Sequence, residues 1–67
     1  MKVYRHRLLD GVYWINANNS WFVFNPLNEE PLVHTEEAHS IGKRVYAVSK
    51  PLRLRMEDAL TIHMLLN

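Results

Sequence analysis

Apolar and polar residues alternate in three short, aromatic-rich segments over the first 25 residues, and two tight-turn signals separate these segments. Asp10-Gly11 is the first signal, because the favoured two-residue hairpin turn needs positive φ at both central residues. Asn18-Asn19 is the second signal, since asparagine tolerates the same backbone conformation. The pattern predicts an antiparallel three-stranded meander over residues 2–25.

The two turns also predict a register for this meander. A two-residue loop at the first turn places Arg7 opposite Trp14, and a two-residue loop at the second turn places Ile15 opposite Phe22. Side chains alternate between the two faces of a strand, so the register assigns every residue to a face. One face would carry Tyr4, His6, Leu8, Tyr13, Ile15, Ala17, Phe22 and Phe24, and the other Arg5, Arg7, Trp14, Asn16, Trp21 and Val23.

The middle of the chain predicts a short helix and a further strand. Thr35 is a good N-cap, and the acidic residues after it favour the start of a helix over residues 36–41. Gly42 would end this helix in the left-handed conformation. Residues 43–48 then alternate as a fourth strand. Because the first hairpin sets the register of the meander, Gly11→Val is expected to destabilise more than Gly42→Val.

The C-terminal part of the chain predicts a second helix. An extended piece at Leu52–Leu54 leads into this helix near Arg55 or Met56, and residues 60–66 are apolar nearly all round. The helical interpretation places Leu52, Met56, Ala59, Ile62, His63 and Leu66 on one face. The predicted fold is α+β: one small domain, 1–67, with an antiparallel β-meander of three to four strands, a short helix, and a C-terminal helix packed on one face.

Composition restricts the kinds of stabilising site and the cellular location that we expect for this domain. The chain has 67 residues, 48% of them apolar, and no cysteine, which excludes disulfides and thiolate zinc sites. No apolar run approaches the roughly 20 residues needed to cross a bilayer, and no apolar stretch follows the charged start as in a signal peptide. We therefore expect a cytoplasmic protein with no membrane partner.

No motif in the chain names a reaction. The serines fall in turns or caps, the two glycines form no phosphate loop, and the paired carboxylates are only sequence neighbours. His34 and His39 are five residues apart, a poor spacing for metal ligands on a helix. A sheet-and-helix domain of this size also lacks the walls for a deep pocket. We expect no enzyme, no catalytic residue, no metal and no cofactor.

The second face of the predicted meander is the candidate partner surface. It sets Arg7 beside Trp14, with Trp21 one strand further over, and arginine and tryptophan are enriched in binding hot spots. The alternative is that the C-terminal helix packs on this face and makes it the core. The candidate partner-binding residues are Arg5, Arg7, Trp14, Trp21, Met64 and Leu65.

These residues predict a non-enzymatic protein-binding module, a small intracellular regulator or inhibitor that occupies a partner protein's surface. The nearly all-apolar end of the C-terminal helix leaves homodimerisation open as well. Because this face is expected to be exposed, Trp14→Ala or Trp21→Ala is expected to weaken partner binding more than folding.

Nucleic-acid binding is the alternative function. Bases of single-stranded RNA or DNA would stack on the tryptophans while arginines meet phosphates. The basic residues available for this role are Lys43, Arg44, Lys50, Arg53 and Arg55. A net charge of only +1 and the glutamates in the middle of the chain argue against it.

One segment has a family resemblance. Residues 31–41, PLVHTEEAHSI, resemble the end of the carbon-storage-regulator family of small RNA-binding dimers. The resemblance does not extend to the preceding strands, so no functional residue is carried over from that family.

Overall fold

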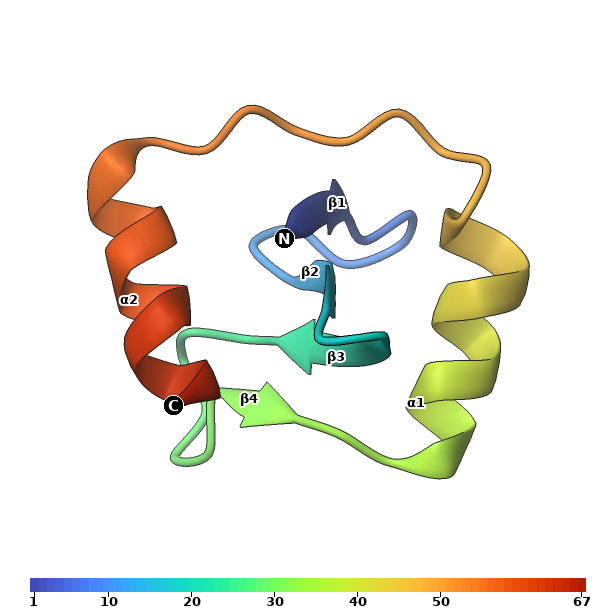
Figure 1. Cartoon of the computed structure of the whole chain (residues 1–67), viewed down its shortest axis with the longest axis horizontal. Coiled ribbons are helices and arrows are strands. Elements are labelled where there is room, and N and C mark those ends of the chain that lie inside the picture. Colours follow the sequence, from blue (N-terminus) through green and yellow to red (C-terminus); the bar gives the residue numbers. More distant parts are fainter.

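A four-stranded antiparallel sheet lies between two helical segments in the computed structural model, which describes residues 1–67 (Figure 1). The strands are β1 (Lys2–Arg5), β2 (Tyr13–Ala17), β3 (Ser20–Phe24) and β4 (Leu32–Val33), in the order β1-β2-β3-β4. The helices are α1 (Glu36–Ile41), which continues as the π-helical segment η1 (Gly42–Tyr46), and α2 (Met56–Leu66). The α+β class and the meander are confirmed.

The second hairpin has the register that the sequence predicts. Ala17 pairs with Ser20 and Ile15 pairs with Phe22. Asn18 and Asn19 both have positive φ, 53° and 61°, as a two-residue turn of this type requires.

The predicted register of the first hairpin is wrong. Tyr4, not Arg7, lies opposite Trp14, and Val3 lies opposite Ile15. This is a shift of three residues, and an odd shift moves every side chain of β1 to the other face of the sheet. Tyr4 therefore joins the tryptophan face, while Val3 joins the face of Ile15.

The shift arises because a longer loop replaces the expected two-residue turn between β1 and β2. The His6 backbone N–H donates to the Val12 carbonyl at 3.0 Å and closes this loop. Inside it, Nδ1 of His6 accepts hydrogen bonds from the backbone N–H groups of Leu8 and Leu9, each at 3.1 Å. Gly11 has φ 74°, so glycine still supplies the positive φ that the loop needs.

The predicted fourth strand at residues 43–48 is also wrong, because the helix begun by Thr35 continues to Tyr46. Thr35 caps the helix as expected, its Oγ1 accepting from the Ala38 N–H at 3.0 Å. Gly42 does not end the helix: its φ is −58° and it lies in the right-handed helical conformation. The Trp21 side chain occupies the space where a Cβ on Gly42 would stand.

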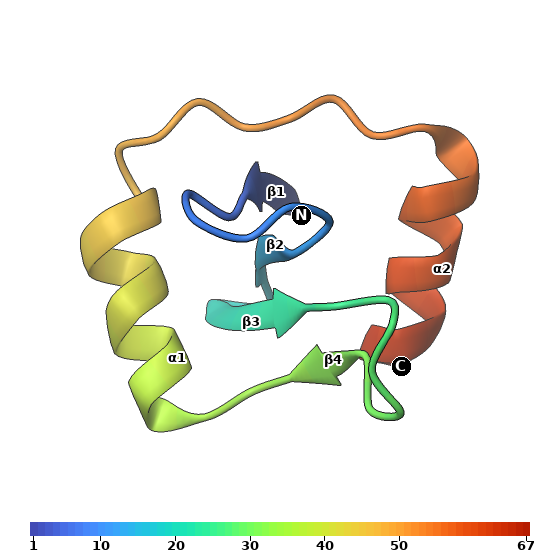
Figure 2. The ribbon, with the colours of Figure 1, turned by 180° about the vertical axis from the view of Figure 1, so that it is seen from behind.

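Each face of the sheet carries its own apolar core, and each helical segment covers one face (Figure 2). The core under α2 contains Val3, Ile15, Ala17, Phe24 and Ile62. The core under α1 and η1 contains Tyr4, Trp14, Trp21, Ala38 and Tyr46.

Helix α2 begins at Met56, as predicted, and packs on the sheet through few residues. Ile62 is its only buried residue, with Leu66 and Ala59 half-buried beside it. The prediction that Met56 and His63 share this inward face is wrong, since both side chains are exposed.

The segment between η1 and α2 covers the outer edge of β1 (Figure 1). The Leu52 backbone N–H donates to the Val3 carbonyl at 2.7 Å, and the two residues form an antiparallel bridge. This pairing holds Leu52–Leu54 extended, as the sequence predicts, and protects an edge that would otherwise be open to another strand.

Candidate functional site

The two tryptophans are core residues, and the prediction that they stand exposed on a binding face is wrong. Trp14 and Trp21 are each 4% exposed. The Trp14 ring stacks on Tyr46, with ring centroids 5.0 Å apart and planes at 26°. Trp21 packs on Tyr4, with ring centroids 5.3 Å apart. The helix that replaces the predicted fourth strand is what covers them.

The two candidate arginines of the first segment lie apart. Arg7 fastens the β1–β2 loop to η1: its Nη2 donates to the Val45 carbonyl at 3.2 Å and lies 3.5 Å from Oγ of Ser49. Its guanidinium carbon is 5.7 Å from the centroid of the Tyr46 ring. Arg5 points to the side of the sheet that α2 covers, where it lines a hollow. Arg7 therefore has a structural role, and only Arg5 remains free for a ligand.

The outward face of α2 is the largest run of exposed apolar side chains on one element. Met56 and Met64 are each 79% exposed and Leu60 is 58% exposed. Residues four apart lie one above the other on a helix, so these three side chains form one stripe. Leu65, at 39% exposed, lies at its side. The sequence prediction named Met64 and Leu65 as partner-binding residues but missed Leu60, although its four-residue spacing from Met56 and Met64 is visible in the chain.

A second exposed apolar feature is the tip of the β1–β2 loop. Leu8 is 88% exposed and Leu9 is 55% exposed. The two hydrogen bonds to Nδ1 of His6 hold both residues in place, which requires an imidazole whose Nδ1 carries no proton. The tip is thus preorganised although nothing packs on it.

Three hollows lie on the surface of the domain. An apolar cavity of about 280 Å³ lies between the sheet and α2, and a polar hollow of about 400 Å³ adjoins it under the linker. A third, open depression of about 360 Å³ lies beside α1. We expected no walls for a deep pocket of several hundred cubic ångströms; the two larger hollows are open to solvent, and the more enclosed one measures about 280 Å³.

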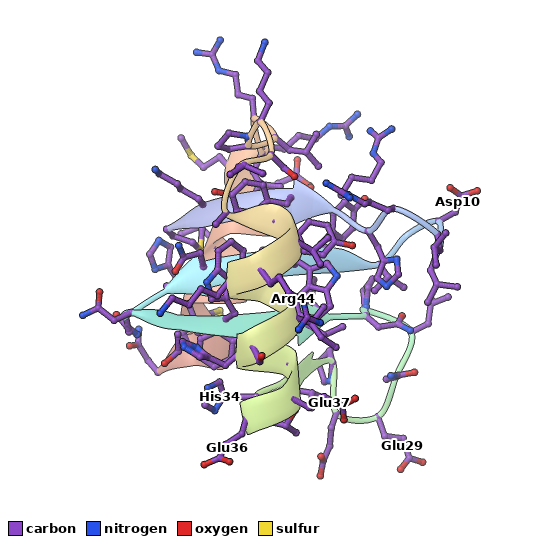
Figure 3. The ribbon with its side chains drawn as sticks, turned by 90° about the vertical axis from the view of Figure 1, so that its right-hand side faces the viewer. Asp10, Glu29, His34, Glu36, Glu37 and Arg44 are labelled. Carbon is purple, nitrogen blue, oxygen red and sulfur yellow. The ribbon has the colours of Figure 1, made fainter.

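The charged side chains are unevenly distributed along the molecule. Lys50, Arg53 and Arg55 belong to the segment that crosses over β1, and Lys43 and Arg44 are exposed on η1. The acidic residues of the middle of the chain gather at the other end: Figure 3 shows Glu29, Glu36 and Glu37 at the lower end of the view. Basic residues thus cluster on one segment although the net charge is only +1, with Glu57 and Asp58 of α2 directly after it.

The histidines of the middle segment make contacts with the sheet. The rings of His34 and His39 are 6.3 Å apart, and the His34 ring is 5.0 Å from that of Phe22. Nδ1 of His39 accepts from the Trp21 backbone N–H at 3.3 Å. The structure contains no group of three or more side chains of the metal-ligating types placed to hold an ion.

No helix of this chain combines the length and the apolar character that crossing a bilayer requires. Comparisons with protein-family models, with curated proteins and with solved structures find no match to this chain.

Proposed function

We propose that this chain is a non-enzymatic protein-binding module, a small cytoplasmic regulator or inhibitor that occupies a partner's surface with the outward face of α2. The observation that carries the proposal is the exposed stripe of Met56, Leu60 and Met64. Helix α2 contacts the sheet through Ile62, Leu66 and Ala59, so the apolar side chains on its opposite face add nothing to that contact. A contiguous exposed apolar patch on a soluble domain typically marks an interaction site.

The residue types in the stripe suit a binding contact. Burial of a leucine or methionine side chain contributes about 1.5–3 kcal/mol, so three of them can supply much of a moderate affinity. The flexible thioethers of Met56 and Met64 adapt to irregular surfaces. An amphipathic helix of this kind is a common ligand of an apolar groove, read through residues one turn apart. We therefore infer a partner that presents such a groove.

Leu60→Lys is expected to weaken partner binding by about 100-fold while leaving the fold intact, because Leu60 is the centre of the stripe. The free energy of unfolding should change by no more than about 0.5 kcal/mol, since the site is exposed and lysine and leucine have similar helix propensities. Proteins retained by immobilised wild-type protein from a cytoplasmic extract would be identified and purified, and each dissociation constant measured by calorimetry.

Leu27→Lys is the matched control, because Leu27 is 93% exposed and lies on the loop before β4. The same change of charge there should leave the affinity unaltered. Equal affinities of wild type and Leu60→Lys, or a larger loss with Leu27→Lys, would contradict the proposal. Sedimentation equilibrium at two concentrations tells whether the partner that binds α2 is a second copy of the chain.

The cluster of Lys50, Arg53 and Arg55 on one segment favours a second candidate, binding of a polyanion such as single-stranded nucleic acid along this segment. Fluorescence anisotropy with a labelled single-stranded oligonucleotide at several salt concentrations tests this candidate. Each contacted phosphate should contribute about −0.7 to the slope of log K against log salt concentration, and Arg53→Gln should reduce the slope by about that amount. A slope near zero would exclude it.

A further inference from the structure

The N-terminal half of α2 leaves part of the sheet uncovered. Ile62 packs into the core, and the residues one helical turn before it on the same face are Asp58 and Ala59. A helix that completed the core would carry large apolar side chains at these two positions. Their absence leaves the cavity of about 280 Å³, whose apolar walls are Val3, Tyr13, Phe24, Pro26, Leu54 and Ile62.

The adjoining hollow of about 400 Å³ contains three arginines. Arg5 comes from the end of β1, and Arg53 and Arg55 come from the segment that leads into α2. Tyr13, Leu54 and Asp58 line both hollows, so the two spaces adjoin. A molecule whose charged end lies among the arginines can therefore extend its apolar end into the cavity.

The backbone places these arginines together. Leu52 pairs with Val3 through the 2.7 Å hydrogen bond from its N–H to the Val3 carbonyl, which holds the linker beside β1. Arg53 and Arg55 follow Leu52 on this segment, and both line the hollow together with Leu52 and Leu54. Arg5 reaches the same place because it pairs with Tyr13 at the end of β1.

The electrostatics of the polar hollow favour an anion. The residues that line this hollow include Arg5, Arg53 and Arg55 but only one acidic residue, Asp58, so its lining carries an excess of positive charge. The first turn of α2 adds to this, because its N-cap residue Arg55 makes no side-chain capping hydrogen bond and the first N–H groups of the helix lack side-chain acceptors there. Planar guanidinium groups match the oxygens of carboxylates and phosphates in paired hydrogen bonds.

We propose that the two hollows form one binding site for a small amphipathic oxyanion. Its carboxylate or phosphate group lies between Arg5, Arg53 and Arg55, and its hydrocarbon part enters the cavity beside Ile62. The polar hollow of about 400 Å³ lies within the range of about 300–1,000 Å³ that small-molecule sites occupy, and the apolar cavity adds about 280 Å³ beside it. The site lies on the inward side of α2, so it does not depend on the outward stripe or on the proposed protein partner.

The test is a titration of the ¹⁵N-labelled full-length protein followed by two-dimensional NMR. Decanoate and decyl phosphate are the amphipathic probes, methyl decanoate lacks the charge, and acetate lacks the chain. We expect saturable shifts of the amides of Tyr13, Leu54 and Thr61 with one or both amphipathic probes, and the tighter of the two identifies the head group. Methyl decanoate and acetate should bind at least about tenfold more weakly.

Variants separate the arginines from general charge effects. Arg53→Gln/Arg55→Gln should weaken decanoate binding by about tenfold or more, and Asp58→Asn should tighten it by up to about fivefold by removing the opposing carboxylate. Lys43→Gln/Arg44→Gln removes the same charge from η1 and should leave the affinity unchanged. All these positions are exposed, so the variants are expected to fold.

Several outcomes would overturn the proposal. Methyl decanoate binding as tightly as decanoate would leave the arginines without a role, and an equal loss with the η1 variant would show a general charge effect. Shifts confined to the Met56–Met64 stripe would place the probe on the outward face of α2. A single-stranded oligonucleotide is the alternative ligand of the arginines. If it displaced decanoate, bound more tightly and shifted the same amide signals, the arginines would bind a polyanion and not a small amphipathic oxyanion.

Discussion

Gly42→Ala is expected to unfold this protein or to lower its free energy of unfolding by about 3 kcal/mol, the upper end of the usual cost of overpacking. A Cβ at this position would stand 2.6 Å from Cγ and Cδ2 of Trp21 and 2.7 Å from its Cβ. Rotation of the indole cannot relieve the last contact, because the Cβ of Trp21 is fixed to the backbone of β3. A domain of this length has only about 3–5 kcal/mol of stability to lose.

The sign of this effect distinguishes packing from helix propensity. Gly42 lies in helical backbone, where alanine is intrinsically better than glycine by about 1 kcal/mol. Gly11→Ala is the matched control: a Cβ on Gly11 would have no atom within 4 Å, and the cost is that of positive φ, about 1–2 kcal/mol. Urea denaturation followed by circular dichroism measures both. A Gly42→Ala variant as stable as wild type, or less affected than Gly11→Ala, would contradict the tight contact.

This expected order reverses the one that the sequence suggests, and the reason is a long-range contact. Judged locally, Gly42 follows a short amphipathic segment and looks like a helix end. Its role depends on Trp21, which belongs to a strand on the far side of an intervening loop. The helical spacing of Ala38, Ile41 and Val45 is present in the chain, yet Val45 and Ala47 fit a strand equally well. The helix is favoured over the strand because it buries the indole rings of the sheet, a long-range contact that the local pattern does not contain.

The second hairpin could be predicted because everything that determines it is local. Asn18 and Asn19 supply the turn, and the pairing of Ile15 with Phe22 follows by counting outward. The first hairpin has an equally good turn signal in Asp10-Gly11, but there the His6 side chain accepts two backbone N–H groups and stabilises a longer loop. Turn propensity alone does not predict that a side chain such as His6 will stabilise a longer loop in place of the two-residue turn.

The error in register also hid the candidate oxyanion site. Under the predicted pairing Arg5 shares a face with Trp14 and not with Tyr13. The observed shift places Arg5 beside Tyr13 on the side of α2, where it meets Arg53 and Arg55. The sequence identified all three arginines as candidates for binding, but it could not bring them together, because their proximity depends on the length of one loop.

Trp14→Ala is the second change expected to have a large effect, a loss of about 3–5 kcal/mol in the free energy of unfolding. Trp14 fills the centre of the core under α1 and η1, stacked on Tyr46 and, with ring centroids 6.2 Å apart, on His6. Removing the indole leaves a cavity between the sheet and the helix and takes away the surface on which η1 rests. This outcome is the reverse of the sequence-based expectation that the change would harm binding rather than folding.

Two measurements check this assignment. The tryptophan emission of the folded protein should be blue-shifted and resistant to quenching by iodide. As a control, Leu8→Ala at the exposed tip of the β1–β2 loop should change the free energy of unfolding by no more than about 0.5 kcal/mol. Trp14→Phe should cost clearly less than Trp14→Ala, because the phenyl ring keeps much of the contact and removes the buried Nε1–H, which has no hydrogen-bond partner. Red-shifted, readily quenched emission would instead place the tryptophans at the surface, and the helix over them would then not be a stable part of the fold.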